Sequence, residues 1–309
     1  MANDRKTFVV VNPNSANGST RRLWPEIEEK ISAAIGCFEW RFTCSQGDAT
    51  RITREALNEG YDQIVALGGD GTNNEVVNGF FVDGKPINPQ AAFAFICRGT
   101  GGDFRKTFGW GIGIDEALAR IKGDKERCID LGSFSYLSHQ GETKRSIFIN
   151  ITSFGIGGLV DHYVNTTSKA FGGKASFLFG TVRALLTYRN QPVTLRLDDG
   201  PAESHVINSV AVANGRFFGG GMMVAPNAEP DDGLFDVVIM GDWSKTDMVT
   251  HGTDIYKGEH LKHAKTQVRR ARKLTATSEQ KVLLDMDGEA PGRLPCEFQI
   301  LPKALRLKG

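Results

Sequence analysis

Between Gln63 and Gly79 the chain passes from a short apolar run, through a turn with three glycines, into apolar residues spaced as in a helix. Residues 64–67 predict a buried strand of a parallel sheet, and residues 72–81 predict a helix. Glycine lets a backbone approach a ligand closely, and a helix N-terminus carries free N–H groups and a partial positive charge. This order of elements therefore predicts a phosphate-binding turn, although a tight connection without a ligand would also use glycines.

One carboxylate, that of Asp70, lies among these glycines. The sequence gives it no evident packing role. A carboxylate beside phosphates is best explained by a bridging Mg²⁺, because that ion prefers hard oxygen ligands. The string G-x-x-x-x-G-K-[ST] is absent, so we expect backbone N–H groups and a metal, instead of a loop lysine, to hold the phosphates. The glycines also lack the G-x-G-x-x-G spacing of dinucleotide-binding folds.

Strands and helices are predicted to alternate over residues 1–132, which indicates an α/β domain with a doubly wound, mostly parallel sheet. Ligands of such sheets bind at the carboxyl ends of the strands. Three loops rich in Gly, Thr, Ser or Asn are expected at that edge, namely residues 12–18, 68–72 and 98–104. We also expect Asp48 to be the N-cap of the helix that follows it.

From residue 133 onward, short strand-like runs separated by turn signals replace this alternation. They predict a C-terminal antiparallel β-sandwich domain over residues 133–301, with residues 302–309 available to return to the first domain. Two helical insertions are expected, at 159–188 and 244–257. Each of the following runs is expected to be a single strand: 133–138, 146–152, 193–198, 205–213, 234–240, 266–276, 281–284 and 296–301.

Composition argues against several classes of protein. A net charge of +1 gives no field that would attract nucleic acid. Five cysteines without C-x-x-C spacing argue for reduced thiols in the cytoplasm and against a disulfide frame or a zinc site. No apolar run reaches the roughly 18 residues of a transmembrane helix, and the N-terminus lacks the apolar region of a signal peptide. Neither H-E-x-x-H nor G-x-S-x-G occurs, which argues against zinc-hydrolase and serine-esterase chemistry.

Three strings together resemble the signature of the diacylglycerol kinase-like lipid kinases, whose relatives include sphingosine kinases and, more distantly, NAD kinases and phosphofructokinases. They are Gly68-Gly-Asp-Gly-Thr-x-Asn-Glu-Val-x-Asn-Gly79, Asn12-Pro-Asn-Ser-Ala-Asn-Gly18 and Gly99-Thr-Gly-Gly-Asp-Phe104, where Gly102 replaces the Asn of the family. The resemblance implies an NAD kinase/phosphofructokinase-like domain that binds ATP through Asn12, Pro13, Ser15, Thr43, Gly68, Gly69, Asp70, Gly71, Thr72, Asn74, Glu75, Thr100 and Asp103.

The stretch Asp285-Met-Asp-Gly-Glu289 carries three carboxylates within five residues. They repel one another unless a cation or a proton lies between them, or unless the stretch is simply a solvated turn. The stretch is similar to the Asp-Gly-Glu motif of the family. This similarity implies that Glu289 is the general base on the lipid hydroxyl and that Asp287 supports it or the metal, while Asp70 serves the Mg²⁺.

The loop Pro226–Asp236 resembles the loop that holds a structural Mg²⁺ in bacterial members of the family. By this resemblance Asp232 supplies a carboxylate, and Glu229 and Leu234 supply backbone carbonyls. A plain β-turn would explain the same residues.

Residues 257–273 carry seven Lys and Arg side chains and one Glu. Such a run is either a solvated face or a surface for anionic lipid. Together the patterns predict a cytoplasmic lipid kinase that uses ATP and Mg²⁺, phosphorylates a diacylglycerol-like lipid, and docks transiently at the inner face of the membrane. A kinase for a soluble acceptor such as NAD, a non-catalytic nucleotide- or lipid-binding protein on the same scaffold, and a homodimer all stay open.

Overall fold

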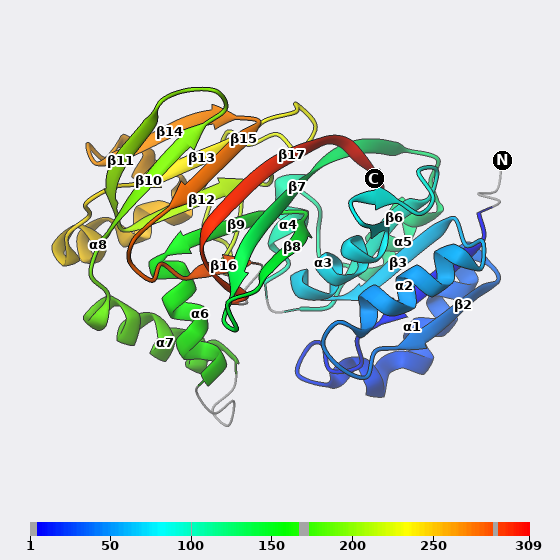
Figure 1. Ribbon diagram of the computed structural model, residues 1–309. Coiled ribbons are helices and arrows are strands. Elements are labelled where there is room, and N and C mark those ends of the chain that lie inside the picture. Colours follow the sequence, from blue (N-terminus) through cyan, green and yellow to red (C-terminus); the bar gives the residue numbers. More distant parts are fainter. Residues whose placement is uncertain (1–4, 100, 167–172, 287–289) are drawn as a thin grey trace. The chain divides into compact units, whose positions relative to one another are not determined.

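The computed structural model describes residues 5–99, 101–166, 173–286 and 290–309 (Figure 1). The chain divides into two compact units: unit 1 is Met1–Leu131 with Pro302–Gly309, and unit 2 is Gly132–Leu301. Three predicted site residues, Thr100, Asp287 and Glu289, lie outside the described residues. No helix in the described part of the chain is long and apolar enough to cross a membrane.

Unit 1 contains a parallel sheet in the strand order β6-β3-β1-β2, continued beyond β6 by the last residues of β17. The register aligns Val11 with Leu67 and Gly68 with Cys97, so the carboxyl ends of neighbouring strands lie at one level. The elements are β1 (Thr7–Val11), α1 (Ser19–Ile35), β2 (Phe38–Phe42), α2 (Asp48–Asn58), β3 (Gln63–Gly68), α3 (Asp70–Gly79), β4 (Phe81–Val82), β5 (Lys85–Pro86), β6 (Ala92–Cys97), α4 (Asp103–Thr107), α5 (Ile114–Lys122) and β7 (Glu126–Ser138).

The apolar pattern explains where these elements lie. Strands β1, β3 and β6 are buried along their whole length, as parallel strands covered on both faces must be. Strand β2, at the edge of the sheet, alternates half-buried and exposed residues. Helix α1 buries Trp24, Ile27 and Ile31, and the indole of Trp24 packs against Trp40 and Phe42 of β2. The predicted helix–strand alternation of unit 1 therefore rests on a buried sheet with amphipathic helices.

Unit 2 contains antiparallel strands in two groups. One has the order β14-β13-β12-β9-β16, and the other has β11-β10-β15-β17, with β7 pairing both β17 and β8. These strands are β8 (Thr143–Phe148), β9 (Ile151–Gly155), β10 (Gln191–Leu197), β11 (Ala202–Ile207), β12 (Ser209–Ala213), β13 (Phe235–Met240), β14 (Thr266–Ala271), β15 (Lys273–Thr277), β16 (Leu284–Met286) and β17 (Gly292–Lys308). The predicted fold class, a mostly parallel α/β sheet followed by an antiparallel β-sandwich, is confirmed.

Three of the predicted single strands are wrong, because each run forms two strands that belong to different sheets of unit 2. Residues 146–152 divide into β8 and β9, residues 205–213 into β11 and β12, and residues 266–276 into β14 and β15. A polar residue marks each crossing. The side chain of Asn150 donates to a backbone carbonyl (2.8 Å), and that of Asn208 donates to another Asn (3.2 Å).

The helical insertions also differ in detail from the prediction. The first consists of two helices, α6 (Ile156–Thr166) and α7 (Gly173–Thr187), and the second is α8 (Lys245–His251) followed by the 3-10 helices η2 (Gly252–Lys257) and η3 (Glu259–Lys262). The strand predicted at 281–284 lies two to three residues later, as β16. It pairs with β9, which brings Asp285 opposite Ser153.

Candidate active site

Four loops of unit 1 meet where β1, β2, β3 and β6 end. The backbone N–H of Asn12 donates to the carbonyl of Leu67 (2.9 Å), and that of Arg98 donates to the carbonyl of Gly68 (2.7 Å). The N–H of Thr43 donates to the carbonyl of the last residue of β1 (2.9 Å). The structure thus brings the three predicted glycine- and asparagine-rich loops, and Thr43, to one edge of the sheet.

The glycines at this edge have different tasks. A Cβ atom on Gly99 would lie 2.9 Å from the Cα of Gly69, so the two turns meet backbone to backbone. A Cβ atom on Gly68 would collide with the side chain of Thr72. At Gly71, in contrast, no atom beyond the adjacent residues and the backbone of its own helix lies within 4 Å of the Cβ position. Close packing of protein atoms therefore explains Gly68 and Gly99, whereas Gly71 faces open space.

Helix α3 begins at Asp70, two residues before the predicted start, and Gly69 is its N-cap. No side chain caps this N-terminus. The first N–H groups of a helix have no partner within the helix, and they carry the positive end of its dipole. This end of α3 is therefore a ready anion site, next to the open space at Gly71.

The side chain of Asp70 does have a packing role, contrary to the prediction. Its carboxylate accepts hydrogen bonds from the backbone N–H groups of Asp103 (3.0 Å) and Phe104 (3.4 Å). These N–H groups begin the short helix α4, so Asp70 joins the β3–α3 turn to the β6–α4 loop. Burial raises the pKa of Asp70, and the neighbouring Asp103 carboxylate adds to this effect, while the N–H bonds oppose it.

Asp103 is buried and forms the second carboxylate of the site. The Nζ of Lys106, one turn along α4, donates to its Oδ1 at 2.6 Å. A Cβ atom on Gly101 would lie 3.1 Å from the Oδ2 of Asp70 and 3.7 Å from the Oδ2 of Asp103, so both carboxylates border the same small region. Mg²⁺ is usually coordinated by one or two carboxylates together with substrate phosphates, so Asp70 and Asp103 fit that ion.

Gly102, which stands where the motif that this loop resembles has Asn, has a left-handed backbone with φ of 58°. Asn tolerates this conformation, so the backbone alone does not demand glycine. A Cβ atom at this position would, however, lie 2.5 Å from the Sγ of Cys97. Burial raises the pKa of the Cys97 thiol, and the nearby Asp70 carboxylate raises it further. Cys97 and Gly102 therefore share one space in the site.

The loop after β1 is held by its own polar side chains. The Nδ2 of Asn12 donates to the Oγ1 of Thr72 (3.0 Å), which connects this loop to α3. The hydroxyl of Ser15 lies 2.7 Å from the hydroxyl of Thr20, and the Nε of Arg98 donates to the same Thr20 hydroxyl (3.1 Å). Pro13, between Asn12 and Ser15, is buried. Asn12 and Ser15, which were predicted to contact a nucleotide, therefore form hydrogen bonds that hold the loops of unit 1 together.

Two further predicted residues on α3 face protein. The Oε2 of Glu75 accepts from the backbone N–H of Ala49 (3.2 Å) at the start of α2, and Asn74 is buried. Gly47 and not Asp48 is the N-cap of α2, so that prediction was wrong; Asp48 instead accepts from a backbone N–H four residues earlier (2.8 Å). Glu75 therefore positions α3 against α2.

Sequence reasoning missed α4 and two charged residues, Lys106 and Arg98. Five residues are too few to show helical periodicity, so α4 left no pattern to detect. Lys106 follows Asp103 by three residues, a spacing that places the two on one helix face and could have signalled the ion pair. Arg98 follows β6 directly, at the predicted edge, and position alone could have marked it.

In unit 2 the predicted catalytic residues Asp287 and Glu289 are outside the described residues, but Asp285 just before them is described. It lies on β16, buried, and accepts a hydrogen bond from the hydroxyl of Ser153 (3.0 Å). This bond assigns Asp285 a place in the packing of unit 2.

The loop Pro226–Asp236 already has a cation beside its acids. The guanidinium of Arg270 pairs with Asp232, and its Nε lies 3.7 Å from the Oδ2 of Asp236. Asp236 is buried, which raises its pKa, and its Oδ2 accepts no hydrogen bond. The Oδ1 of Asp232 accepts from the N–H of Leu234 (3.0 Å), as in a turn. An unsatisfied buried carboxylate oxygen fits a divalent cation in this loop, but Arg270 competes for the same charge.

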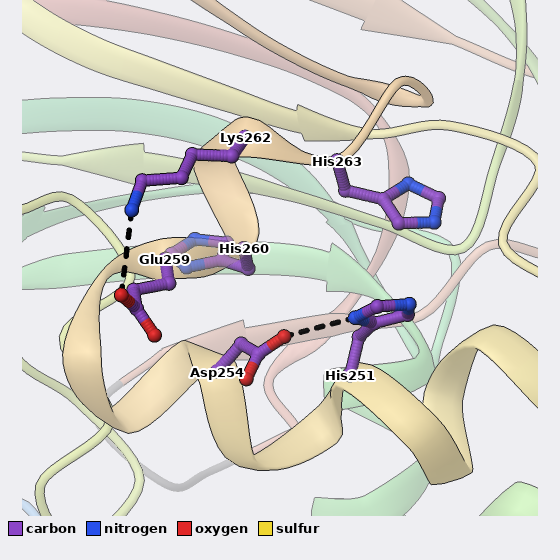
Figure 2. A pocket seen from close by; sticks show the side chains of 6 residues that line it. All are labelled: His251, Asp254, Glu259, His260, Lys262 and His263. Atoms are coloured by element: carbon purple, nitrogen blue, oxygen red, sulfur yellow. Dashed lines mark hydrogen bonds and ion pairs between the residues drawn. The ribbon is translucent and has the colours of Figure 1, made fainter.

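A cavity of about 250 Å³ in unit 2 is lined by His251, Asp254, Glu259, His260, Lys262 and His263 (Figure 2). The side chains pair with each other or with the backbone. Nδ1 of His251 lies 2.9 Å from Asp254, Lys262 is 3.3 Å from Glu259, and Nε2 of His260 lies 3.0 Å from a carbonyl. Across the described residues, no group of three or more His, Cys, Asp or Glu could hold a metal ion.

Comparisons with known proteins cover nearly the whole chain. Residues 6–134 match the diacylglycerol kinase catalytic domain, and residues 150–309 match the YegS C-terminal NAD kinase beta sandwich-like domain. The chain is similar to a diacylglycerol kinase of Staphylococcus carnosus, with 27% identity over 95% of this chain and 92% of the relative.

Solved structures show the same fold. A diacylglycerol kinase from Bacillus anthracis superposes with a TM-score of 0.69 at 22% identity, covering 98% of this chain and 96% of that chain. An NAD kinase from Archaeoglobus fulgidus in complex with ATP superposes with a TM-score of 0.50 at 13% identity, covering 98% and 93%. At these identities the likeness is one of fold.

Proposed function

Because the chain belongs to the diacylglycerol kinase-like lipid kinases, we propose that it transfers the γ-phosphoryl group of ATP to the hydroxyl of a diacylglycerol-like lipid. The observation that carries this proposal is the uncapped N-terminus of α3 beside the carboxylates of Asp70 and Asp103. A helix end that attracts phosphate, next to hard oxygen ligands, is what a nucleotide bound with Mg²⁺ requires.

The phosphates are bound by backbone groups in this proposal. The N-terminus of α3 carries no side-chain cap and includes the open position Gly71, and the turn before it packs backbone to backbone against Gly99. Such a rigid turn needs no reorganisation when the nucleotide binds. Lys106 is paired with Asp103 and in this proposal balances the charge of the two carboxylates.

Asp70 and Asp103 would hold the Mg²⁺, which when bound neutralises charge on the phosphoryl group in transfer. Two carboxylates side by side repel each other, and Lys106 reduces this repulsion. The carboxylate of Asp70 is also fixed by the two N–H groups of α4. These bonds hold the oxygens in place before the nucleotide arrives.

Glu289 is the proposed general base. Its carboxylate takes the proton of the acceptor hydroxyl, the hydroxyl oxygen forms a bond to the γ-phosphorus, and the bond from that phosphorus to the β,γ-bridging oxygen breaks, so that ADP leaves. The support for this role is the sequence motif, with Asp287 as the supporting carboxylate. Asp285 is less suited, because Ser153 engages it within the packing.

The test is phosphoryl transfer from γ-³²P-labelled ATP to diacylglycerol, sphingosine and NAD, assayed separately with the product identified. We expect label in diacylglycerol or a closely related lipid. Label in NAD alone would replace the lipid assignment with the soluble-acceptor alternative, which the shared fold with an NAD kinase keeps open.

The matched variant in this assay is Glu289→Gln, which keeps the size of the side chain and removes its basicity. Turnover should fall by about 10²–10⁴-fold, the usual contribution of a general base. Nucleotide affinity, measured on the same preparation by equilibrium binding, should stay near that of the unmodified protein. If Glu289→Gln keeps more than about half of the normal turnover, another residue is the general base. If it loses ATP affinity, Glu289 binds the metal or has a structural role.

A further inference from the structure

Three large apolar side chains are exposed where α7 ends and α8 begins. Val182 and Leu186, one turn apart on α7, are 48% and 66% exposed, and Val249 on α8 is 70% exposed. The Nζ of Lys245, on the same face of α8 as Val249, donates to the backbone carbonyl of Leu186 (2.6 Å). This bond brings the two helix ends together (Figure 1). These three apolar residues and the basic residues Arg183, Arg189 and Lys245 form a surface that we call the α7–α8 patch.

The basic residues of the α7–α8 patch are Arg183, Arg189 and Lys245, all exposed. Arg183 lies over the ring of Tyr163, 4.2 Å from its centroid. Among the described residues, no carboxylate forms an ion pair with any of these three cations. Two carboxylates lie close by: that of Asp242 accepts from Asn190 (2.7 Å), and that of Asp247 on α8 pairs with Lys265 (2.8 Å). The patch therefore combines apolar side chains with a net positive charge.

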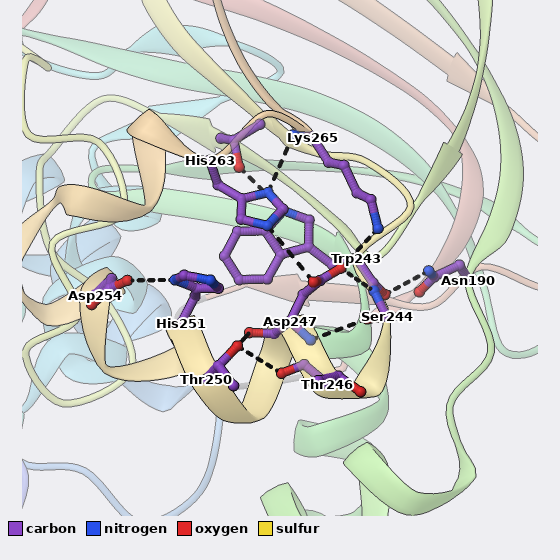
Figure 3. A network of polar contacts seen from close by, with 11 residues as sticks. Asn190, Trp243, Ser244, Thr246, Asp247, Thr250, His251, Asp254, His263 and Lys265 are labelled. Carbon is purple, nitrogen blue, oxygen red and sulfur yellow. Dashed lines mark hydrogen bonds and ion pairs between the residues drawn. The ribbon is translucent and has the colours of Figure 1, made fainter.

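The basic run at 257–273 offers no comparable charge. Five of its seven cations pair with carboxylates: Lys262 with Glu259, Lys265 with Asp247, Arg269 with Glu203, Arg270 with Asp232 and Asp236, and Lys273 with Glu297. Figures 2 and 3 show two of these pairs. Paired cations add little to the attraction of an anionic surface, so the run behaves as a solvated face.

Helix α8 is held firmly in this position (Figure 3). Ser244 and Asp247 form a capping box at its N-terminus, in which each side chain accepts from the backbone N–H of the other. Asn190, three residues after α7, donates to the backbone carbonyl of Trp243 (2.8 Å), and Trp243 is buried. Lys245 and Val249 therefore lie on a capped helix and not on a frayed end.

We propose that the α7–α8 patch is the surface through which the protein docks on an anionic lipid bilayer; this rests on the proposed lipid substrate. Apolar side chains flanked by Lys and Arg match the boundary between acyl chains and anionic headgroups. Val182, Leu186 and Val249 enter the boundary, while Arg183, Arg189 and Lys245 meet the lipid phosphates. Each cation should raise binding to anionic vesicles by about fivefold at low salt.

Vesicle binding tests this directly, without ATP or acceptor. Purified protein is mixed with vesicles of phosphatidylcholine alone or of phosphatidylcholine with phosphatidylglycerol, and the bound fraction is measured by sedimentation. The double variant Leu186→Ser/Val249→Ser should lower the partition coefficient for the anionic vesicles by about tenfold or more. Arg183→Glu/Arg189→Glu should remove the preference for phosphatidylglycerol. The matched control, Val206→Ser/Val268→Ser, removes exposed apolar residues of β11 and β14 and should bind normally.

Activity on a short-chain diacylglycerol dispersed in water separates this proposal from the proposed function. The patch variants should phosphorylate that acceptor at the normal rate and lose activity only on vesicles. Equal vesicle binding by patch variants and control would overturn the docking proposal, as would a change from dimer to monomer in light scattering without loss of vesicle binding. Vesicle binding that depends on the patch, with no phosphorylation of any lipid, would uphold the docking surface and refute the kinase reaction.

Discussion

The carboxylate of Asp70 joins two loops of the candidate site, and in the proposed function it also binds the metal. Its carboxylate holds the first N–H groups of α4 and at the same time borders the region where a nucleotide phosphate would lie. The sequence places Asp70 in a glycine turn and so predicts its chemistry. It cannot predict the bond to Asp103, because that partner is 33 residues away and α4 has no periodic signal.

Two substitutions at Asp70 separate the two tasks. Asp70→Asn keeps an oxygen that can accept from the N–H of Asp103 and removes the charge that a metal needs. It should abolish phosphoryl transfer while the melting temperature changes little. Asp70→Ala should also destabilise the protein, by about 1–3 kcal/mol, because a buried N–H loses its charged acceptor. Activity assays and thermal unfolding of both variants check this, and near-normal turnover of folded Asp70→Asn would contradict the metal role.

Cys97 and Gly102 provide a second test at the scale of single residues. Gly102→Asn should destabilise the protein by about 1–3 kcal/mol, because its Cβ enters the space of the Cys97 sulfur. The double variant Cys97→Ala/Gly102→Asn should be more stable than the sum of the two single changes predicts. Chemical denaturation of the four proteins gives this coupling. Strictly additive effects would show that the two positions do not share one space.

At the scale of elements, the residue pattern within a segment predicts whether that segment forms a strand or a helix when the segment alone determines it. Strands β3, β10 and β13, predicted at 64–67, 193–198 and 234–240, were predicted close to their observed bounds, because consecutive apolar or alternating residues mark them in the sequence. The corners at Asn150 and Asn208 were missed. An apolar run on both sides of a polar residue looks like one strand, and only the pairing partners show that the chain has changed sheets.

The pairing of β13 with β14 puts Arg270 opposite Asp236 and gives a test of the predicted metal loop. Arg270→Ala should cost about 1 kcal/mol without metal, since the guanidinium is half exposed. It should also make the melting temperature rise more steeply with added MgCl₂, because Asp232 and Asp236 become available to the ion. Arg269→Ala, on the neighbouring position, is the control. Adding Asp232→Ala should remove the dependence of the melting temperature on MgCl₂. If no variant shows such a dependence, the loop does not bind the ion.

For the whole molecule, the change from helix–strand alternation to short separated strands was enough to predict the fold class. The motif positions were enough to predict which loops of unit 1 come together, because parallel strands put their carboxyl ends at one edge. The ion pairs formed by the basic run at 257–273 could not be predicted from the sequence. Its partners come from η3, α8, β11, the loop before β13 and β17, so only the assembled unit shows that most of its charge is neutralised.

The path of β17 has a consequence for how the protein is made. Its earlier residues pair with β15, while Arg306 and Leu307 pair with β6 at the edge of the parallel sheet. Leu305 and Leu307 are buried there. A ribosome delivers residues 5–131 long before residues 302–308, so the nascent first unit has an unfinished sheet edge throughout the synthesis of the second. Because exposed strand edges invite wrong pairing, we expect the edge of β6 to be open to wrong pairing until residues 302–308 have been synthesised.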